Sequence, residues 1–110
     1  MKDALSPIFA ALADPTRRAI LSSLTHGDAT VAQLARPFEM SQPAISKHLR
    51  VLEAAGLISR TRVATARYSH LEPAALQKAS EWVDAYRQYW TESFDKLDTA
   101  LARYQEETPS

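Results

Sequence analysis

The ten residues from 41 to 50, SQPAISKHLR, concentrate hydroxyl, amide and cationic side chains around one proline. A serine shortly before a proline is typical of a helix N-terminus, because serine caps the free amides and proline fits the first turn. Ile45, Leu49 and Leu52 fall on one stripe of this helix, which predicts that they face a core. The opposite face would display Gln42, Pro43, Ser46, Lys47 and Arg50, with His48 toward one flank.

This polar face has the chemistry that contacts DNA. A glutamine can pair with adenine through two hydrogen bonds, and an arginine or lysine can reach the O6 and N7 atoms of guanine. A serine can bond a phosphate or a base edge. Pro43 lacks an amide hydrogen that would have no partner in the first turn, and its ring fixes the angle at which the helix begins. We therefore predict that this helix enters a DNA groove.

Other helix starts precede the polar segment. Ser6-Pro7 and Asp14-Pro15 each place a capping residue before a proline and predict two helices. Thr30 and Gln33 have the spacing of a capping box and predict a third, shorter helix. The three-residue turn at 39–41 joins that helix to the polar one. Two helices joined in this way form a helix-turn-helix.

The pattern changes after Gly56. Residues 57–71, LISRTRVATARYSHL, alternate loosely and are rich in β-branched and aromatic side chains, which predicts two short strands with a turn near 64–66. After Pro73 we predict one uninterrupted helix of about thirty residues, because no further proline or glycine occurs before Pro109. Its apolar residues recur every 3.5 positions on average, the period of helices that pack along their length. These seam residues are Leu76, Ala79, Val83, Tyr86, Trp90, Phe94, Leu97, Leu101 and Tyr104.

Charge is divided unevenly along a chain whose formal net charge is zero. Residues 14–70 contain eight lysines and arginines and four acids, whereas residues 71–110 contain four and eight. A basic middle followed by an acidic segment favours one surface for an anionic partner and another surface for a different role. The 110 residues, 45% hydrophobic and 24% charged, are suited to one globular domain.

Cysteine is absent, which excludes disulfides, thiolate nucleophiles and thiolate metal sites. No apolar run approaches the roughly 20 residues of a membrane span. No signal peptide is expected, because Asp14, Arg17 and Arg18 stand where its apolar segment and cleavage site would have to be. We therefore expect a cytoplasmic protein with no cofactor and no membrane partner.

The segments ALADPTRRAIL, SQPAISKHLRVLEAAGLI and WVDAYRQYWTESFDKLDTAL resemble the ArsR/SmtB family of repressors, and more closely its cysteine-free members. The resemblance runs from about Ile8 to Leu101. It implies a mainly α fold with a small β-hairpin wing, a winged helix-turn-helix that dimerises through its terminal helices. We expect one winged-helix DNA-binding domain over residues 1–110, with 73–106 as a long C-terminal dimerisation helix region. The expected function is a homodimeric, autoregulatory repressor that binds double-stranded operator DNA at an inverted repeat.

The resemblance also implies which residues act. It implies that the recognition helix carries Ser41, Gln42, Ser46, Lys47 and His48, and that the wing carries Arg60, Arg62 and Arg67. With Pro43 and Arg50 from the outward face, these are the expected DNA-binding residues. The implied dimer-interface residues are Leu5, Ile8, Phe9, Leu76, Trp82, Val83, Tyr86, Trp90, Phe94 and Leu97. The thiolate positions of metal-sensing members correspond to Thr30 and Ala32, and no histidine follows His70, so no metal site is expected.

Several alternatives stay open. A winged-helix module can bind proteins without binding DNA specifically. An enzyme is disfavoured by the lack of a nucleophile elbow, a zinc-protease motif or a P-loop. The aromatic side chains around Trp82 and Trp90 suit dimer packing, or a pocket for an unidentified small-molecule inducer, and a protein could also act as inducer. Arg17 and Arg18 lie at a helix start, where a phosphate or an acidic side chain would offset the unfavourable helix dipole, and we favour a phosphate.

Overall fold

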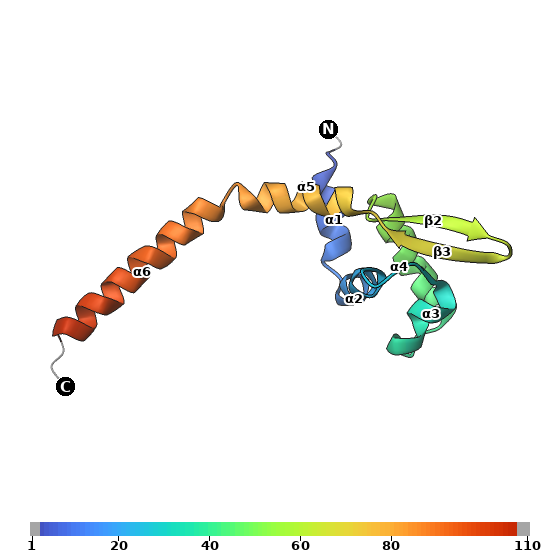
Figure 1. Ribbon diagram of the computed structural model, residues 1–110, viewed down its shortest axis with the longest axis horizontal. Coiled ribbons are helices and arrows are strands. Elements are labelled where there is room, and N and C mark those ends of the chain that lie inside the picture. The colour runs from blue at the N-terminus through green and yellow to red at the C-terminus, as the bar shows by residue number, and fades with distance from the viewer. Residues whose placement is uncertain (1–2, 108–110) are drawn as a thin grey trace. The chain divides into compact units, whose positions relative to one another are not determined.

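The computed structural model describes residues 3–107 of the 110-residue chain and divides into two compact units after Ala79 (Figure 1). The division falls inside the helix that begins at Pro73, the residue at which the C-terminal region was expected to start. Helices of the first unit are α1 (Leu5–Leu12), α2 (Pro15–Leu24), α3 (Val31–Ala35), a 3₁₀ turn (Arg36–Phe38) and α4 (Gln42–Ala54). Its strands are β1 (Ala29–Thr30), β2 (Ile58–Val63) and β3 (Ala66–Leu71). Helix α5 (Pro73–Asp84) crosses the division, and α6 (Arg87–Glu107) lies in the second unit.

Three of the predicted caps are confirmed. The Asp14 carboxylate accepts from the Arg17 amide at 3.0 Å at the start of α2. Thr30 and Gln33 form both bonds of the capping box, and the Ser41 hydroxyl accepts from the amide of Ala44 at 3.3 Å. Each cap satisfies an amide that has no partner inside its helix.

The predicted start of the first helix at Ser6-Pro7 is wrong. Helix α1 begins at Leu5, so both residues lie inside its first turn. The Asp3 carboxylate accepts from the Ser6 amide at 2.7 Å and from its hydroxyl at 2.9 Å. These bonds lower the pKa of Asp3, with the amide bond as the main cause. A carboxylate is a favoured partner for helix amides, and this one stands three residues before the serine.

The two predicted strands are confirmed and form an antiparallel hairpin, called the wing below. Val63 pairs with Ala66, so Ala64 and Thr65 make a two-residue turn. Ala64 adopts a left-handed backbone with φ of 56°, which a residue with a side chain adopts infrequently. The short strand β1 was not predicted; it pairs with β3 and gives the sheet order β1-β3-β2.

The core of the first unit confirms the apolar stripe of α4. Ile45, Leu49 and Leu52 are each 0% exposed. Ile20 from α2 and Leu57 before β2 are also fully buried in the same cluster. Helix α4 is therefore held by its apolar stripe, and its other side is left for polar residues.

The predicted uninterrupted helix after Pro73 is wrong, because α5 ends at Asp84 and α6 begins at Arg87. At the break, the Tyr86 amide donates to the Val83 carbonyl at 3.0 Å, a bond across three residues. The break is spanned by an ion pair between Arg87 and Asp84 at 2.8 Å and by the rings of Trp82 and Tyr86, 5.1 Å apart. No proline or glycine marks this break, so residue type alone does not predict it.

Within the described residues, no helix combines the length and the apolar character needed to cross a membrane.

One exposed pair joins the wing to the loop before β1. His70 Nδ1 lies 2.7 Å from Asp28 Oδ1, and the pKa of His70 is raised first by this hydrogen bond and then by the charge of Asp28. Since the pKa is raised in the folded chain, the stabilisation is present below about 6.5 and is lost as the pH rises through the raised value. We expect an NMR titration to place the pKa of His70 above 6.5. Asp28→Asn should return it toward that value, and an unchanged pKa in that variant would contradict this pair.

Candidate nucleic-acid interface

The outward side of α4 carries most of the side chains predicted to contact DNA. Gln42, Pro43, Lys47 and Arg50 are exposed, and Ser46 is half-buried. Ser41 is exposed at the cap, where its oxygen accepts the amide of Ala44 while its hydroxyl hydrogen is free to be donated elsewhere. Helix α3 and the turn before Ser41 precede this helix, as a helix-turn-helix requires (Figure 1).

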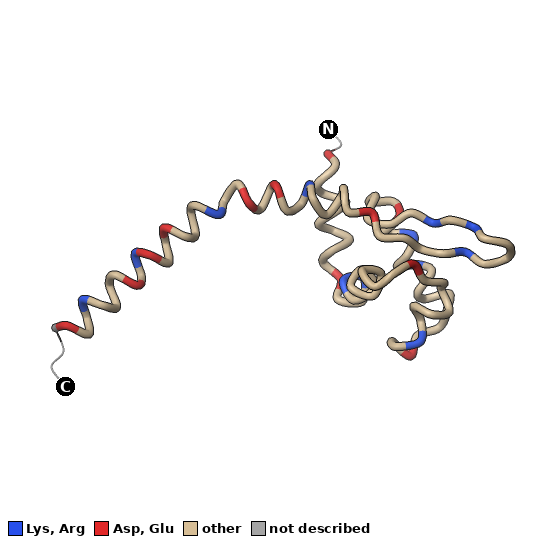
Figure 2. The backbone as a smooth tube through the Cα atoms, viewed as in Figure 1, with Lys and Arg blue, Asp and Glu red and all other residues tan. Residues whose placement is uncertain are grey.

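The strand register gathers the three arginines of the wing on one face. Arg60 pairs with Ser69, and Arg62 pairs with Arg67. Directly opposed residues of an antiparallel pair share a face, and alternate residues of one strand do so too. Arg60, Arg62 and Arg67 therefore lie on the face that buries Ser69, and blue segments mark both strands of the wing in Figure 2.

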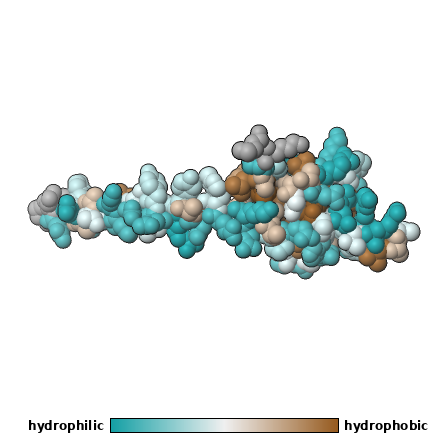
Figure 3. Space-filling model, turned by 90° about the horizontal axis from the view of Figure 1, so that it is seen from above, coloured by the Kyte–Doolittle hydropathy of each residue, from teal (hydrophilic) through white to brown (hydrophobic). Residues whose placement is uncertain are grey.

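Two features of this face favour an anionic ligand. Directly opposed like charges, as at Arg62 and Arg67, destabilise a sheet, and a bound anion would offset their repulsion. The Nε atom of Arg60 is buried and has no hydrogen-bond partner among the described residues. By contrast, the tip beyond these arginines is uncharged, Val63 there is 59% exposed, and Figure 3 shows a hydrophobic area at that end of the wing.

Within the part of the chain that the structure describes, no acid forms an ion pair with the cations of α4 and the wing. These cations are Lys47, Arg50, Arg60, Arg62 and Arg67. The ion pairs found within residues 3–107 involve other basic residues, namely His48, His70 and Arg87. Unpaired cations on one unit raise the local potential for an anion such as a phosphate.

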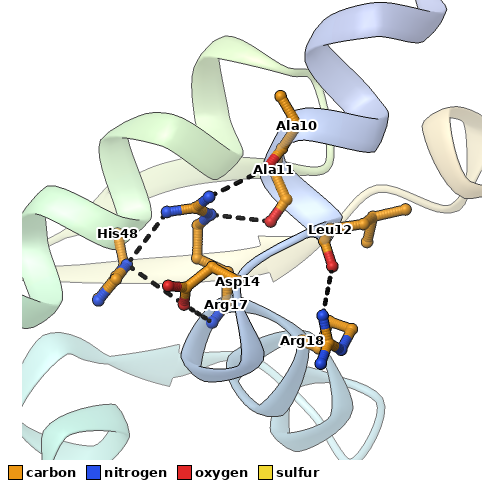
Figure 4. A network of polar contacts seen from close by, with 7 residues as sticks. All are labelled: Ala10, Ala11, Leu12, Asp14, Arg17, Arg18 and His48. Carbon is orange, nitrogen blue, oxygen red and sulfur yellow. Dashed lines mark hydrogen bonds and ion pairs between the residues drawn. The ribbon is translucent and has the colours of Figure 1, made fainter.

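Arg17 and Arg18 do not fit the phosphate role favoured from the sequence. The Arg17 guanidinium donates to the carbonyls of Ala11 at 2.8 Å and Ala10 at 3.1 Å, and Arg18 donates to that of Leu12 at 2.8 Å (Figure 4). These carbonyls lie in the last turn of α1, where helix carbonyls run short of amide partners, although that of Ala10 also accepts from the Ala13 amide at 3.3 Å. The expectation is therefore corrected, because both arginines cap the preceding helix.

His48 also lies differently from the residues around it. Its side chain is 20% exposed, and Nδ1 faces inward, 3.4 Å from Arg17 Nη1 and 3.8 Å from Asp14 Oδ2 (Figure 4). The pKa of Asp14 is lowered, first by the bond from the Arg17 amide and also by the charge of Arg17. Spacing on α4 placed His48 at a flank, but the contact with a residue 31 positions earlier has no local signal.

The residues expected at a dimer interface fall into two groups. Trp82, Val83, Tyr86, Trp90, Phe94 and Leu97 are exposed by 37–64% in α5, α6 and the turn between them. In the first unit Phe9 is 37% exposed, Leu5 is half-buried, and Leu76 is half-buried against the core. The expectation for Ile8 is corrected: it is 2% exposed and belongs to the core of its own unit.

No group of three or more histidine, cysteine, aspartate or glutamate side chains that could hold a metal ion occurs in the part of the chain that the structure describes.

Comparison with known proteins gives a consistent match. A family model described as "Bacterial regulatory protein, arsR family" matches residues 14–60. The HTH-type transcriptional regulator Rv2034 of Mycobacterium tuberculosis is 42% identical over 81 residues, which span 74% of this chain and 73% of the relative. The transcriptional repressor SdpR of Bacillus subtilis is 39% identical over 79 residues, spanning 72% of this chain and 88% of the relative.

Solved structures agree with these relatives. The crystal structure of an ArsR family transcriptional regulator matches with a TM-score of 0.74 and 38% identity, over 81% of this chain and 98% of that one. The solution structure of a homodimeric winged helix-turn-helix DNA-binding domain from Mycobacterium bovis matches with a TM-score of 0.64 and 28% identity. That match covers 79% of this chain and 82% of the other.

Proposed function

This chain belongs to the ArsR family of bacterial regulatory proteins, and we propose that it represses transcription as a homodimer bound to operator DNA in the cytoplasm. The observation that carries the proposal is the set of five cations on α4 and the wing that form no ion pair within residues 3–107. Phosphates would bind the wing arginines, and the exposed side of α4 would enter the major groove. An operator that overlaps its own promoter would make the repressor autoregulatory by excluding polymerase.

The proposed homodimer is supported by the second unit. From Trp90 to Tyr104 the apolar residues of α6 follow one another at spacings of four and three, the pattern of a helix-packing seam. Phe94, Leu97 and Leu101 on this seam are each at least 50% exposed. An apolar stripe of this kind on a single chain marks an interaction surface. The solved relative from Mycobacterium bovis, described as homodimeric, supports a second copy of this chain as the partner.

Dimer symmetry sets the form of the proposed operator. A two-fold axis would place two copies of α4 about 34–36 Å apart, which is one turn of DNA. The purified chain should therefore enrich, from a pool of randomised duplexes, an imperfect inverted repeat with half-sites about 10 base pairs apart. Enrichment of no common sequence would contradict sequence-specific binding and favour a protein-binding role.

Lys47→Ala should weaken binding to all DNA sequences alike. Lys47 is exposed and unpaired on α4, so its replacement would leave one phosphate without its cation and lower the salt slope of log K by about 0.9. Binding measured across a salt series checks this result, and Lys78→Ala on α5 is the matched control. An unchanged slope in Lys47→Ala would exclude a phosphate contact at this lysine.

Gln42→Ala should instead relax base preference. Gln42 is exposed in the first turn of α4, where a side chain can reach base edges. A base contact carries sequence information, and each mismatched base pair costs about 1–3 kcal/mol in such complexes. Competition between the operator and single-base variants measures the preference. A Gln42→Ala chain that discriminates as well as the unaltered chain would contradict the assignment.

A further inference from the structure

We propose that Arg17 is a positioning residue for DNA recognition, which orients His48 and selects its tautomer while tying α4 to the end of α1. The proposal rests on the DNA-binding function proposed above. It concerns a residue that points into the first unit and not toward a ligand. The three elements that it joins are α1, the start of α2 and the middle of α4 (Figure 4).

Each nitrogen of the Arg17 guanidinium makes a polar contact. Nε donates to the Ala11 carbonyl at 2.8 Å and Nη2 donates to the Ala10 carbonyl at 3.1 Å. Nη1 lies 3.4 Å from His48 Nδ1. Only the planar fork of an arginine can address three acceptors in these directions, because a lysine offers a single nitrogen.

This contact determines which ring nitrogen of His48 carries the hydrogen. A guanidinium has donors and no acceptor, so Nδ1 must accept, and the neutral ring then carries its hydrogen on Nε2. Asp14 Oδ2 lies farther from Nδ1, at 3.8 Å, and is itself held by the Arg17 amide at 3.0 Å. In Figure 4 the second ring nitrogen points away from Arg17, so the ring presents one defined donor on that side.

The contact between Arg17 and His48 also fixes the part of α4 that carries the proposed DNA contacts. His48 follows Lys47 directly in the sequence and is only 20% exposed, so its ring is a fixed point next to a proposed phosphate contact. Binding sites need their side chains within about 0.5 Å and 10–20° of the productive geometry. The apolar stripe would still hold α4 without the Arg17 link, but the His48 ring and the surface of α4 beside Lys47 would lose their fixed orientation. Operator affinity would then fall although Arg17 touches no DNA.

Arg18 provides a matched control. It is the next residue on α2 and it also donates to a carbonyl at the end of α1, that of Leu12 at 2.8 Å. The hydrogen bond to His48 belongs to Arg17 and not to Arg18. Arg17→Lys and Arg18→Lys both keep the charge and both weaken the capping of α1, at two carbonyls for Arg17 and at one for Arg18. Only Arg17→Lys also breaks the link to α4.

The test measures operator binding by fluorescence anisotropy across a salt series, with folding checked by thermal unfolding. We expect Arg17→Lys and Arg17→Gln to bind about tenfold more weakly with an unchanged salt slope, and Arg18→Lys to stay within about twofold. A slope lowered by about 0.9 in Arg17→Gln would show a direct phosphate contact and overturn the proposal. Equally weakened binding in the Arg17 and Arg18 variants would overturn it as well.

Two further readouts separate positioning from a general structural role. In a double-mutant cycle, Arg17→Lys should cost less than about twofold when His48 is already alanine, and fully additive effects would refute the link. In the free protein at neutral pH, ¹⁵N NMR should show the hydrogen of His48 on Nε2, and Arg17→Lys should change the populations of the two tautomers. The opposite tautomer in the unaltered chain would overturn the proposal. Since this readout needs no DNA, a failure of operator binding would refute the proposed function separately.

Discussion

Leu97→Asp is expected to convert the proposed homodimer into a monomer and to lower operator affinity by about 100-fold or more. Leu97 is 53% exposed on α6, between Phe94 and Leu101 on the seam. A carboxylate buried in an apolar interface without a partner loses its hydration and costs several kcal/mol. A monomer binds only one half-site and loses the gain from linked sites, which reaches about 10²- to 10⁴-fold.

Thr99→Asp is the control for this variant. Thr99 lies on the same helix two residues away but off the seam, so the same negative charge is added outside the proposed interface. Sedimentation equilibrium measures the oligomeric state of both variants, and anisotropy measures their DNA binding. A Leu97→Asp chain that stays dimeric, or a Thr99→Asp chain whose affinity falls equally, would contradict the interface.

Leu49→Ala should destabilise the first unit by about 2–5 kcal/mol, because it opens a cavity in a core that relaxes only in part. Leu49 is 0% exposed on α4 and belongs to the buried cluster with Ile45 and Leu52. A change of this size is a large fraction of the roughly 5–15 kcal/mol that stabilises a domain, and should lower the melting temperature by about 10 °C or more.

Val51→Ala, two residues after Leu49 on α4, is the matched control for Leu49→Ala. Val51 is 41% exposed, so its truncation should change the free energy of unfolding by no more than about 0.5 kcal/mol. Denaturant unfolding of both variants tests the difference. Equal stabilities would mean that Leu49 does not anchor α4 in the core.

Local signals explain why most of the helix-turn-helix could be predicted. A cap and its amide lie three residues apart, as at Thr30 and Gln33, so a short window contains the whole interaction. The stripe of Ile45, Leu49 and Leu52 follows from the helix period in the same way. The ArsR family resemblance agreed with these elements and with the hairpin, and the comparisons confirmed it.

The features that were missed depend on partners distant in sequence or on competing local choices. Strand β1 has two residues and exists only because Ala29 and Thr30 pair with β3. The contact between Arg17 and His48 spans 31 positions and could not be predicted from a short window of sequence. The position of Arg17 at a helix start suggested a phosphate partner, but its guanidinium donates to carbonyls of α1. At the start of α1 the sequence predicted Ser6 as the cap, but the Asp3 carboxylate accepts the amide of Ser6 instead.

The candidate site was predictable to a similar degree. Side chains that point outward on α4, such as Gln42 and Lys47, follow from subtracting the core stripe. The shared face of Arg60, Arg62 and Arg67 depends on strand register, which the two-residue turn at Ala64 determines. The turn contains no glycine or asparagine, so neither its length nor the register could be read from composition.

Sequence-specific DNA binding is the central claim, and fluorescence anisotropy tests it most directly. The purified chain would be titrated against a labelled fragment of its own upstream region and against a scrambled fragment, across a salt series. We predict tight binding with a clear preference for the upstream fragment, and an affinity that falls steeply with salt as phosphate contacts are screened. A flat salt response with equal binding to both fragments would contradict the claim.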